Sequence, residues 1–124
     1  MRTRITVREE QREERRVEVD IEPPFYRHFS HGGDGYDADH WTKVDARDAG
    51  GELFEIEIQR TTRYGYTFED EWEISRRPFR ALADTADYVL GRGKYACTEA
   101  EWEAARGTFL TWCREAGIIW SPKP

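Results

Sequence analysis

The segment from residue 28 to residue 40 contains every histidine of the chain together with three aspartates. Its candidate metal ligands are His28, His31, Asp34 and His40. Imidazole and carboxylate groups coordinate Zn, Mn and Fe, and a glycine-rich segment can fold around an ion. The spacing, however, fits neither the helix-borne HExxH motif nor the twelve-residue calcium loop with its terminal glutamate. Two interpretations remain, a metal-dependent hydrolase or nuclease site and a solvated loop whose Asp and Gly residues form turns, and we favour the loop.

Nucleophilic catalysis has little support in the sequence. Ser30 and Ser75 lack the GxSxG setting of a nucleophile elbow. Neither Cys97 nor Cys113 has a histidine near it in the sequence. The glycines and basic residues at 91–94 could cradle an anion, but they form no Walker sequence, and the end of a helix explains the glycines. We therefore expect no enzymatic activity, no bound metal and no other cofactor.

Carboxylates alternate with apolar side chains in three segments that have the pattern of strands. They are Glu18, Asp20, Glu22, Glu55, Glu57, Glu69, Glu71 and Glu73. If the three segments share one sheet with their apolar rows inward, all eight carboxylates lie on its other face. Same-face residues repeat every ~6.6 Å along a strand, close to twice the ~3.4 Å axial spacing of charges on one DNA strand. Such a face would present a row of negative charge to a protein that normally holds a nucleic acid.

A simpler interpretation is that these carboxylates only solvate the sheet. An antiparallel sheet that is covered on one face needs polar residues on the other. Arg4 and Arg8 could also pair with the second strand and neutralise part of the row. Against this, like charges directly opposite one another destabilise a sheet. An uncompensated acidic face would therefore lower the stability of the sheet, and a binding function would explain why it is present. The two interpretations predict the same strands and differ only in what the face meets.

Alternating apolar residues predict the strands that would position these groups. Residues 3–8 and 17–22 are expected to form a hairpin across the charged residues 9–16, which could instead form a short helix. Pro23 and Pro24 end the second strand because proline cannot donate to a ladder. Residues 25–30 are expected to form a brief third strand before the histidine-containing loop.

The second half of the sheet is predicted from residues 41–46, 53–59 and 60–75, with turns at 48–51 and near 60–63. The longest of these strands, 60–75, has a single apolar row. That row consists of Tyr64, Tyr66, Phe68, Trp72 and Ile74. Asp70 interrupts it and is expected to mark a bulge, a strand end or an edge.

After residue 75 the apolar spacing becomes helical. Pro78 suits the first turn of a helix that runs to Gly91, and a capping box of Thr98 and Glu101 opens a second helix that ends at Gly117. Strands first and helices last predict an α+β fold, with a four- to five-stranded antiparallel sheet and two C-terminal helices packed on one face. The chain is expected to be a single domain over residues 1–124. Its parts are a sheet-forming part (1–75), two helices (76–117) and a tail (118–124).

Composition and charge limit the classes of function. The 124 residues suffice for one core, and 35% of them are charged, with a net charge of −6. This charge disfavours non-specific binding to nucleic acid and to an anionic membrane. No segment resembles a membrane span or the apolar core of a signal peptide. The two cysteines should lie about 24 Å apart along one helix, too far for a disulfide, so we expect a reduced, cytoplasmic protein.

Two short patterns add a resemblance. VEVDIEPPFY at residues 17–26 leads a strand into a proline–aromatic step, and TEAEWEAA at residues 98–105 opens the closing helix. With the order of strands before helices, they resemble small accessory proteins of phages and mobile elements, among them anti-CRISPR and other anti-defence inhibitors. The resemblance implies a non-enzymatic inhibitor that binds a host nuclease complex, and it carries over no functional residue.

Charge pattern and resemblance together predict an inhibitor whose acidic sheet face acts as a nucleic-acid mimic. It would block the basic, nucleic-acid-binding surface of a CRISPR effector or another host defence nuclease, in the cytoplasm of a bacterial host cell. Its partner would be a protein, with no direct contact to nucleic acid or membrane. The alternative function is a metal-dependent hydrolase or nuclease that uses residues 28–40.

Overall fold

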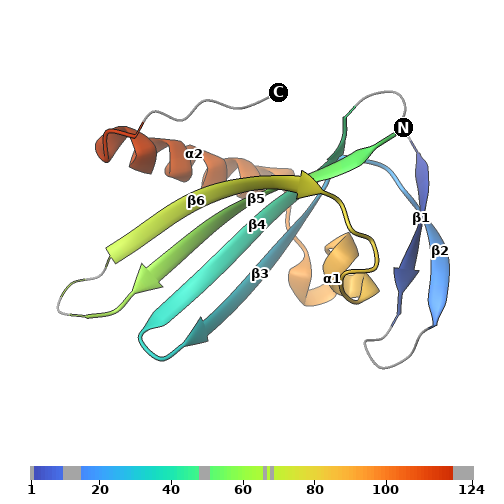
Figure 1. Cartoon of the computed structure of the whole chain (residues 1–124), viewed down its shortest axis with the longest axis horizontal. Helices are drawn as coiled ribbons and strands as arrows, with labels where there is room; N and C mark the ends of the chain where they lie inside the picture. Colours follow the sequence, from blue (N-terminus) through green and yellow to red (C-terminus); the bar gives the residue numbers. More distant parts are fainter. Residues whose placement is uncertain (1, 10–14, 48–50, 66, 68, 119–124) are drawn as a thin grey trace.

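The structure is a computed structural model that describes residues 2–9, 15–47, 51–65, 67 and 69–118 (Figure 1). Within them the chain forms six strands, two α-helices and one 3₁₀ turn. The strands are β1 (Thr3–Arg8), β2 (Arg16–Ile21), β3 (Phe25–Gly33), β4 (Tyr36–Ala46), β5 (Leu53–Arg63) and β6 (Glu69–Pro78). The helices are α1 (Ala86–Leu90) and α2 (Glu99–Glu115), with the 3₁₀ turn at Gly93–Tyr95 between them. The predicted α+β class is confirmed.

The described strands form two antiparallel sheets. β1 and β2 pair as a hairpin, and β3, β4, β5 and β6 pair in that order as a four-stranded meander. Pro23 and Pro24 lack the N–H groups that a ladder needs, and the pairing of β2 stops at Ile21 before them. Figure 1 shows α2 along one side of the meander and α1 between the meander and the hairpin. The expected first hairpin is confirmed, but its second strand does not share a sheet with the later strands.

The segment expected to be a histidine-containing loop is instead a β-hairpin. β3 pairs with β4 along its whole length, from Phe25 opposite Val44 to Gly33 opposite Tyr36. The two-residue turn between them ends in Gly35, whose φ of 81° glycine adopts without steric cost. The loop prediction is therefore wrong, because alternation of side chains along both strands continues to the turn.

The long strand expected at residues 60–75 is also wrong. β5 continues to Arg63, and β6 begins at Glu69, so the chain reverses direction between them. Tyr64 is 46% exposed at this reversal, and Tyr66 and Phe68 lie outside the described residues. Asp70 accepts a hydrogen bond from the hydroxyl of Thr62, its partner across the ladder, at 2.7 Å. The interruption at Asp70 marks the beginning of an edge strand.

The two predicted helices have different outcomes. α2 is confirmed with its capping box, in which the hydroxyl of Thr98 accepts from the N–H of Glu101 at 3.1 Å. α1 begins only at Ala86, so the helix expected from Pro78 onward is wrong over its first half. The N–H of Phe79 donates to the carbonyl of Leu53 at 3.1 Å, which keeps the chain extended beside β5 where a helix was expected.

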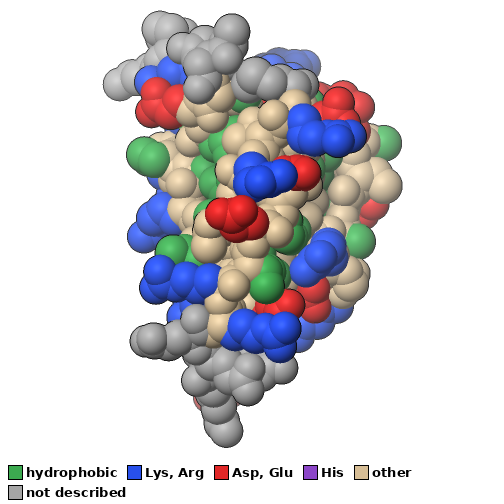
Figure 2. Space-filling view, turned by 90° about the vertical axis from the view of Figure 1, so that its right-hand side faces the viewer, with side chains coloured by type: hydrophobic (Ala, Val, Ile, Leu, Met, Phe, Trp, Pro, Cys, Tyr) green, Lys and Arg blue, Asp and Glu red, His purple; other side chains and the backbone are tan. Residues whose placement is uncertain are grey.

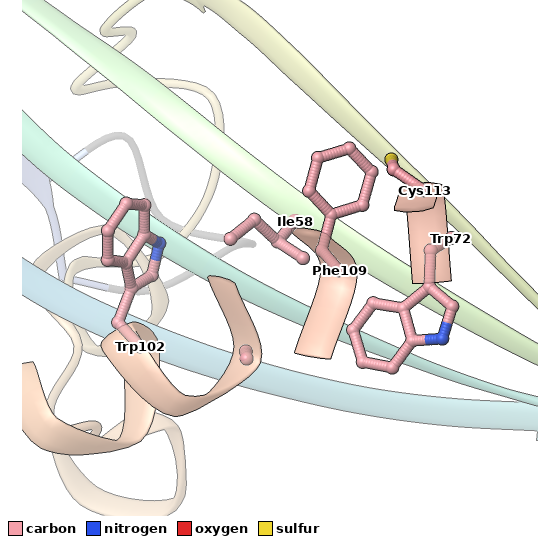
Figure 3. Close-up of a cluster of buried hydrophobic side chains, with 6 residues drawn as sticks. Ile58, Trp72, Trp102, Phe109 and Cys113 are labelled. Carbon is pink, nitrogen blue, oxygen red and sulfur yellow. The ribbon is translucent and has the colours of Figure 1, made fainter. Parts of the chain in front are cut away.

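Two apolar clusters hold these elements together. α2 packs on one face of the meander through Trp102, Phe109 and Cys113, which meet Ile58 and Trp72 of the sheet (Figure 3). A second cluster joins the β1–β2 hairpin to α1. It is built on Val7, Ala86 and Val89, with Ile5, Val17, Val19 and Tyr88 packed against it. The hairpin is thus attached to the meander by way of α1.

The helices also bear on the predictions about a disulfide and about a membrane span. Cys97 and Cys113 are both free, as expected from their places at the two ends of α2. Neither of the described helices has the length and apolar character needed to cross a bilayer.

Candidate functional site

The two faces of the meander carry different chemistry. Register places Trp41, Ile58 and Ile74 side by side on the face that α2 covers. The row next to it, Arg27, Thr42, Glu57 and Ser75, projects to the opposite face. We call this opposite face the network face, because charged residues from Arg27 to His31 form one connected set of hydrogen bonds on it. Tyr88 of α1 lies over Arg27, 4.7 Å from ring centre to guanidinium carbon, so α1 covers part of the network face while α2 covers the other face. Both helices pack against the sheet as predicted, but they do not share one face of it.

The centre of the network is a buried ion pair. Arg27 Nη2 donates to Glu55 Oε2 at 2.8 Å, and both side chains are only 5% exposed. Arg27 Nη1 also donates to the carbonyl of Val89 at 3.2 Å, which ties α1 to β3. Arg77 of β6 donates to Glu55 through Nε and to Glu57 Oε2 through Nη2, the latter at 3.0 Å. Arg27 of β3 and Arg77 of β6 therefore neutralise the two carboxylates of β5 that lie between them.

The network continues into a pair of histidines. His40 Nδ1 lies 2.9 Å from Glu57 Oε1, and His40 Nε2 lies 2.9 Å from Nε2 of the exposed His31. Burial alone would raise the pKa of Glu57, but the hydrogen bond and charge of His40 and the charges of Arg77 and Arg27 outweigh it and lower that pKa. A carboxylate behind an imidazole is the arrangement of a general base. Here both nitrogens of His40 have partners, Glu57 on the inner side and His31 on the outer side, so neither nitrogen faces an open substrate site.

The acidic face expected from the sequence is not assembled. Glu55 is 4% exposed and Glu57 is 9% exposed, so the prediction that both face solvent is wrong. The physical reason is that Arg27 and Arg77 pair with them and α1 packs over that part of the sheet. The alternation placed both side chains on the correct face, but that face is covered at this end.

The carboxylates of the second strand belong to a different surface. Glu18, Asp20 and Glu22 lie on or beside β2 in the separate hairpin, so they are not in line with the meander. Arg4 lies 3.1 Å from Asp20 and 3.8 Å from Glu18. Figure 2 shows this side of the molecule, where Lys and Arg side chains lie among the Asp and Glu side chains. The expectation of one row of eight carboxylates is therefore wrong.

The candidate metal ligands are divided between the two faces. His31 and His40 point to the network face, while His28 lies on the α2 side, stacked on Trp41 at 5.3 Å between ring centres. Asp34 is exposed in the turn between β3 and β4. Among the described residues no group of three or more His, Cys, Asp or Glu side chains is arranged to hold a metal ion. The structure does not bring the four candidates of the hydrolase alternative together.

A serine, a histidine and an aspartate do meet on the α2 side, at the open end of β3. Ser30 Oγ donates to Asp39 Oδ1 at 2.5 Å, and His28 Nε2 lies 3.2 Å from both atoms. Burial alone would raise the pKa of Asp39, but hydrogen bonds from Ser30, Arg60 and His28 lower it. In a catalytic triad the two imidazole nitrogens separate the serine from the acid. Here one nitrogen contacts both, so the group stabilises Asp39 and leaves no activated serine.

Of the predicted carboxylates in the meander, those of β6 stay accessible. β6 is the last strand of the meander, and among the described residues no strand pairs with its outer side. Glu69, Glu71 and Glu73 are exposed there. Glu71 and Glu73, with Thr61, Trp72 and Trp112, line a hollow of about 270 Å³, which we call the edge hollow. It combines two carboxylates with two indole rings at an open sheet edge.

Comparisons with models of protein families, with curated proteins and with solved structures found no match. Function must therefore be argued from the chemistry of this chain's own surfaces.

The arginines of the network are not among the site residues predicted from the sequence. Arg27 lies two residues from both Phe25 and Phe29, so alternation along β3 places it on their face of the sheet and opposite to Tyr26. This spacing is the feature of the sequence that could have identified it. Arg77 follows the same rule on β6, but the predicted strand ended at residue 75 and left it out. The role of both arginines in the network depends on how the strands pair in register, which the sequence alone does not give.

Proposed function

We propose that the protein is a non-enzymatic binding protein that binds a basic segment of a partner protein at the outer edge of β6. The observation that carries the proposal is the edge hollow, in which Glu71 and Glu73 lie beside Trp72 and Trp112. A lysine or arginine side chain entering it would meet the carboxylates together with Trp112, because Trp72 is 7% exposed and already lies against Trp41 and Arg60. Cation–π contacts contribute about 0.5–1 kcal/mol at exposed sites, and exposed ion pairs contribute about 0.2–1 kcal/mol each.

The open edge supplies the second half of the recognition. An extended segment of the partner can add to an exposed strand through main-chain hydrogen bonds, while alternate side chains provide specificity. Glu69, Glu71 and Glu73 repeat along one side of β6, so an added strand with basic residues at every second position matches them.

The partner that we propose is a nucleic-acid-binding protein with a basic surface, such as a nuclease complex of host defence in a bacterial cytoplasm. The net charge of −6 favours such a partner over nucleic acid itself. Relative to the prediction from sequence, the surface is narrower, because three carboxylates on β6 replace eight on a whole face. The resemblance to anti-defence inhibitors of phages supports the choice of partner class.

Affinity capture from the source cell with two charge-matched variants tests the proposal. Glu71→Lys/Glu73→Lys should reduce the captured partner by at least about tenfold, which corresponds to ~1.4 kcal/mol. Glu18→Lys/Glu22→Lys makes the same change of charge on β2 and should leave capture within about twofold, near 0.4 kcal/mol. Equal loss in both variants would show a response to net charge alone, and unchanged capture in the β6 variant would refute the site.

A defined probe separates the edge hollow from a diffuse charge effect. An extended peptide that alternates lysine with valine should bind with a change in tryptophan fluorescence, and Trp112→Ala should weaken its binding without a change of net charge. If Trp112→Ala binds this peptide as well as the unaltered chain does, the hollow is not the recognition element.

A further inference from the structure

The network face contains a second cavity, between α1 and the segment that follows β6. Its volume is about 180 Å³, and its lining includes Arg27, Arg77, Arg80, Glu55, Asp84 and Tyr88. The three arginines come from β3, from β6 and from the turn before α1. Three arginine residues thus line one small space in a chain whose overall charge is negative.

Ion pairs occupy only part of this lining. Arg27 and Arg77 are balanced by Glu55 and by Glu57, which lies just outside the lining, and this leaves Arg80 and Asp84. Glu55 is engaged by Arg27 and Arg77. Asp84 accepts a hydrogen bond from the backbone N–H of Thr85 at 2.7 Å. Arg80 forms no ion pair with any side chain that the structure describes.

Hydrogen-bond donors also remain. Arg77 uses Nε for Glu55 and Nη2 for Glu57, and its Nη1 has no partner among the described side chains. The side chain of Arg77 is 38% exposed, so this nitrogen can be reached by a small molecule. Arg80, which is exposed, adds a complete guanidinium fork. Paired N–H groups of this kind match the oxygens of a carboxylate or a phosphate.

We propose that this cavity binds a small oxyanion, a carboxylate or phosphate group of a small molecule, between Arg77 and Arg80. The anion balances the charge of Arg80, which has no ion pair among the described side chains, and accepts hydrogen bonds from Arg77 Nη1 and from the Arg80 fork. Arg27 supplies positive potential from behind while it stays bound to Glu55 and to the carbonyl of Val89. Tyr88 forms one wall and leaves room for the part of the ligand that carries the anionic group. The site is separate from the edge hollow, so neither proposal depends on the other.

Nuclear magnetic resonance with isotope-labelled full-length chain provides the test. Inorganic phosphate, and separately acetate, is added at constant ionic strength maintained with chloride. Saturable shifts of amide signals in residues 77–89, absent from α2, are expected. Binding of both anions assigns the site to oxyanions in general, and binding of phosphate alone assigns it to phosphate groups. The absence of saturable shifts with either anion would overturn the proposal.

Two matched variants locate the site. Arg80→Gln removes the charge of an exposed residue that has no ion pair among the described residues, and it should weaken anion binding by at least about tenfold. Arg114→Gln makes the same change at the end of α2, on the other side of the meander, and should leave the affinity unchanged. Equal weakening in both variants, or none in Arg80→Gln, would show that the anion responds to overall charge and that the cavity is not its site.

Discussion

Replacement of Glu55 by Gln is the sharpest test of the buried network. The substitution keeps the size of the side chain but removes the negative charge that lies between Arg27 and Arg77. The amide oxygen of Gln can still accept one hydrogen bond, but its nitrogen cannot accept the other. Arg77 keeps its contact with Glu57, whereas Arg27, whose side chain is 5% exposed, is left with no carboxylate in hydrogen-bonding contact.

The magnitude follows from these contacts. Breaking a buried ion pair by removing one partner costs about 3–5 kcal/mol, and hydrogen bonds to charged groups contribute about 1.5–3 kcal/mol each. Because Gln retains one acceptor and Arg77 is partly solvated, we expect the low end, about 3 kcal/mol. For a domain of this size the melting temperature should fall by about 12 °C, at roughly 4 °C per kcal/mol.

Urea unfolding followed by tryptophan fluorescence measures this loss, since the chain contains five tryptophans. Glu71→Gln is the matched control on the same sheet face. Its carboxylate is 63% exposed and lies 3.7 Å from Arg63, so its loss should change the unfolding free energy by less than about 0.5 kcal/mol. If Glu55→Gln is no more destabilising than Glu71→Gln, the buried pair does not stabilise the fold in the way argued.

Three further predictions concern backbone, pH and thiol chemistry. Gly91→Ala should destabilise the protein far more than Gly117→Ala in thermal unfolding, because both glycines have positive φ but only at position 91 would the new Cβ lie 2.1 Å from a backbone oxygen. The pKa values of Glu57 and Asp39 are lowered in the folded state. The two carboxylates therefore stabilise the fold above about pH 5, and this contribution to the unfolding free energy is lost as the pH falls below about 4. Glu57→Gln should make the unfolding free energy, measured from pH 3 to 7, depend less steeply on pH. Burial, followed by the charge of Glu101, raises the pKa of Cys97 to about 11, so its alkylation at pH 8 should be roughly 100-fold slower than that of an unfolded-chain thiol.

Local signals in the sequence were sufficient for part of the fold. The capping box at Thr98 and Glu101 is a contact within one turn, so it could be identified without the rest of the chain. The hairpin of the first two strands follows from alternation alone. By contrast, the reversal between β5 and β6 passes through aromatic and β-branched residues that favour strands, and Gly65 was its only local signal.

The site was harder to predict because it depends on what covers each face. Alternation placed Glu55 and Glu57 opposite the apolar row, which is where they lie. Whether that face meets water or a second layer is decided by α1, which reaches it from residues 86–90 across a gap of about thirty residues in sequence. The pairing of Glu55 with Arg27 and Arg77 is a contact between three strands, and no periodicity within one strand encodes it.

The division into two sheets bears on how the molecule opens. The β1–β2 hairpin is held to α1 through the cluster of Val7, Ala86 and Val89 and through an isolated bridge between Arg8 and Thr85. A two-stranded hairpin is marginally stable on its own in water. Amide hydrogens of β1 and β2 should therefore exchange with solvent through a partial opening that leaves the meander and α2 intact. The chain then behaves as two cooperative units, and α1 determines how strongly they are coupled.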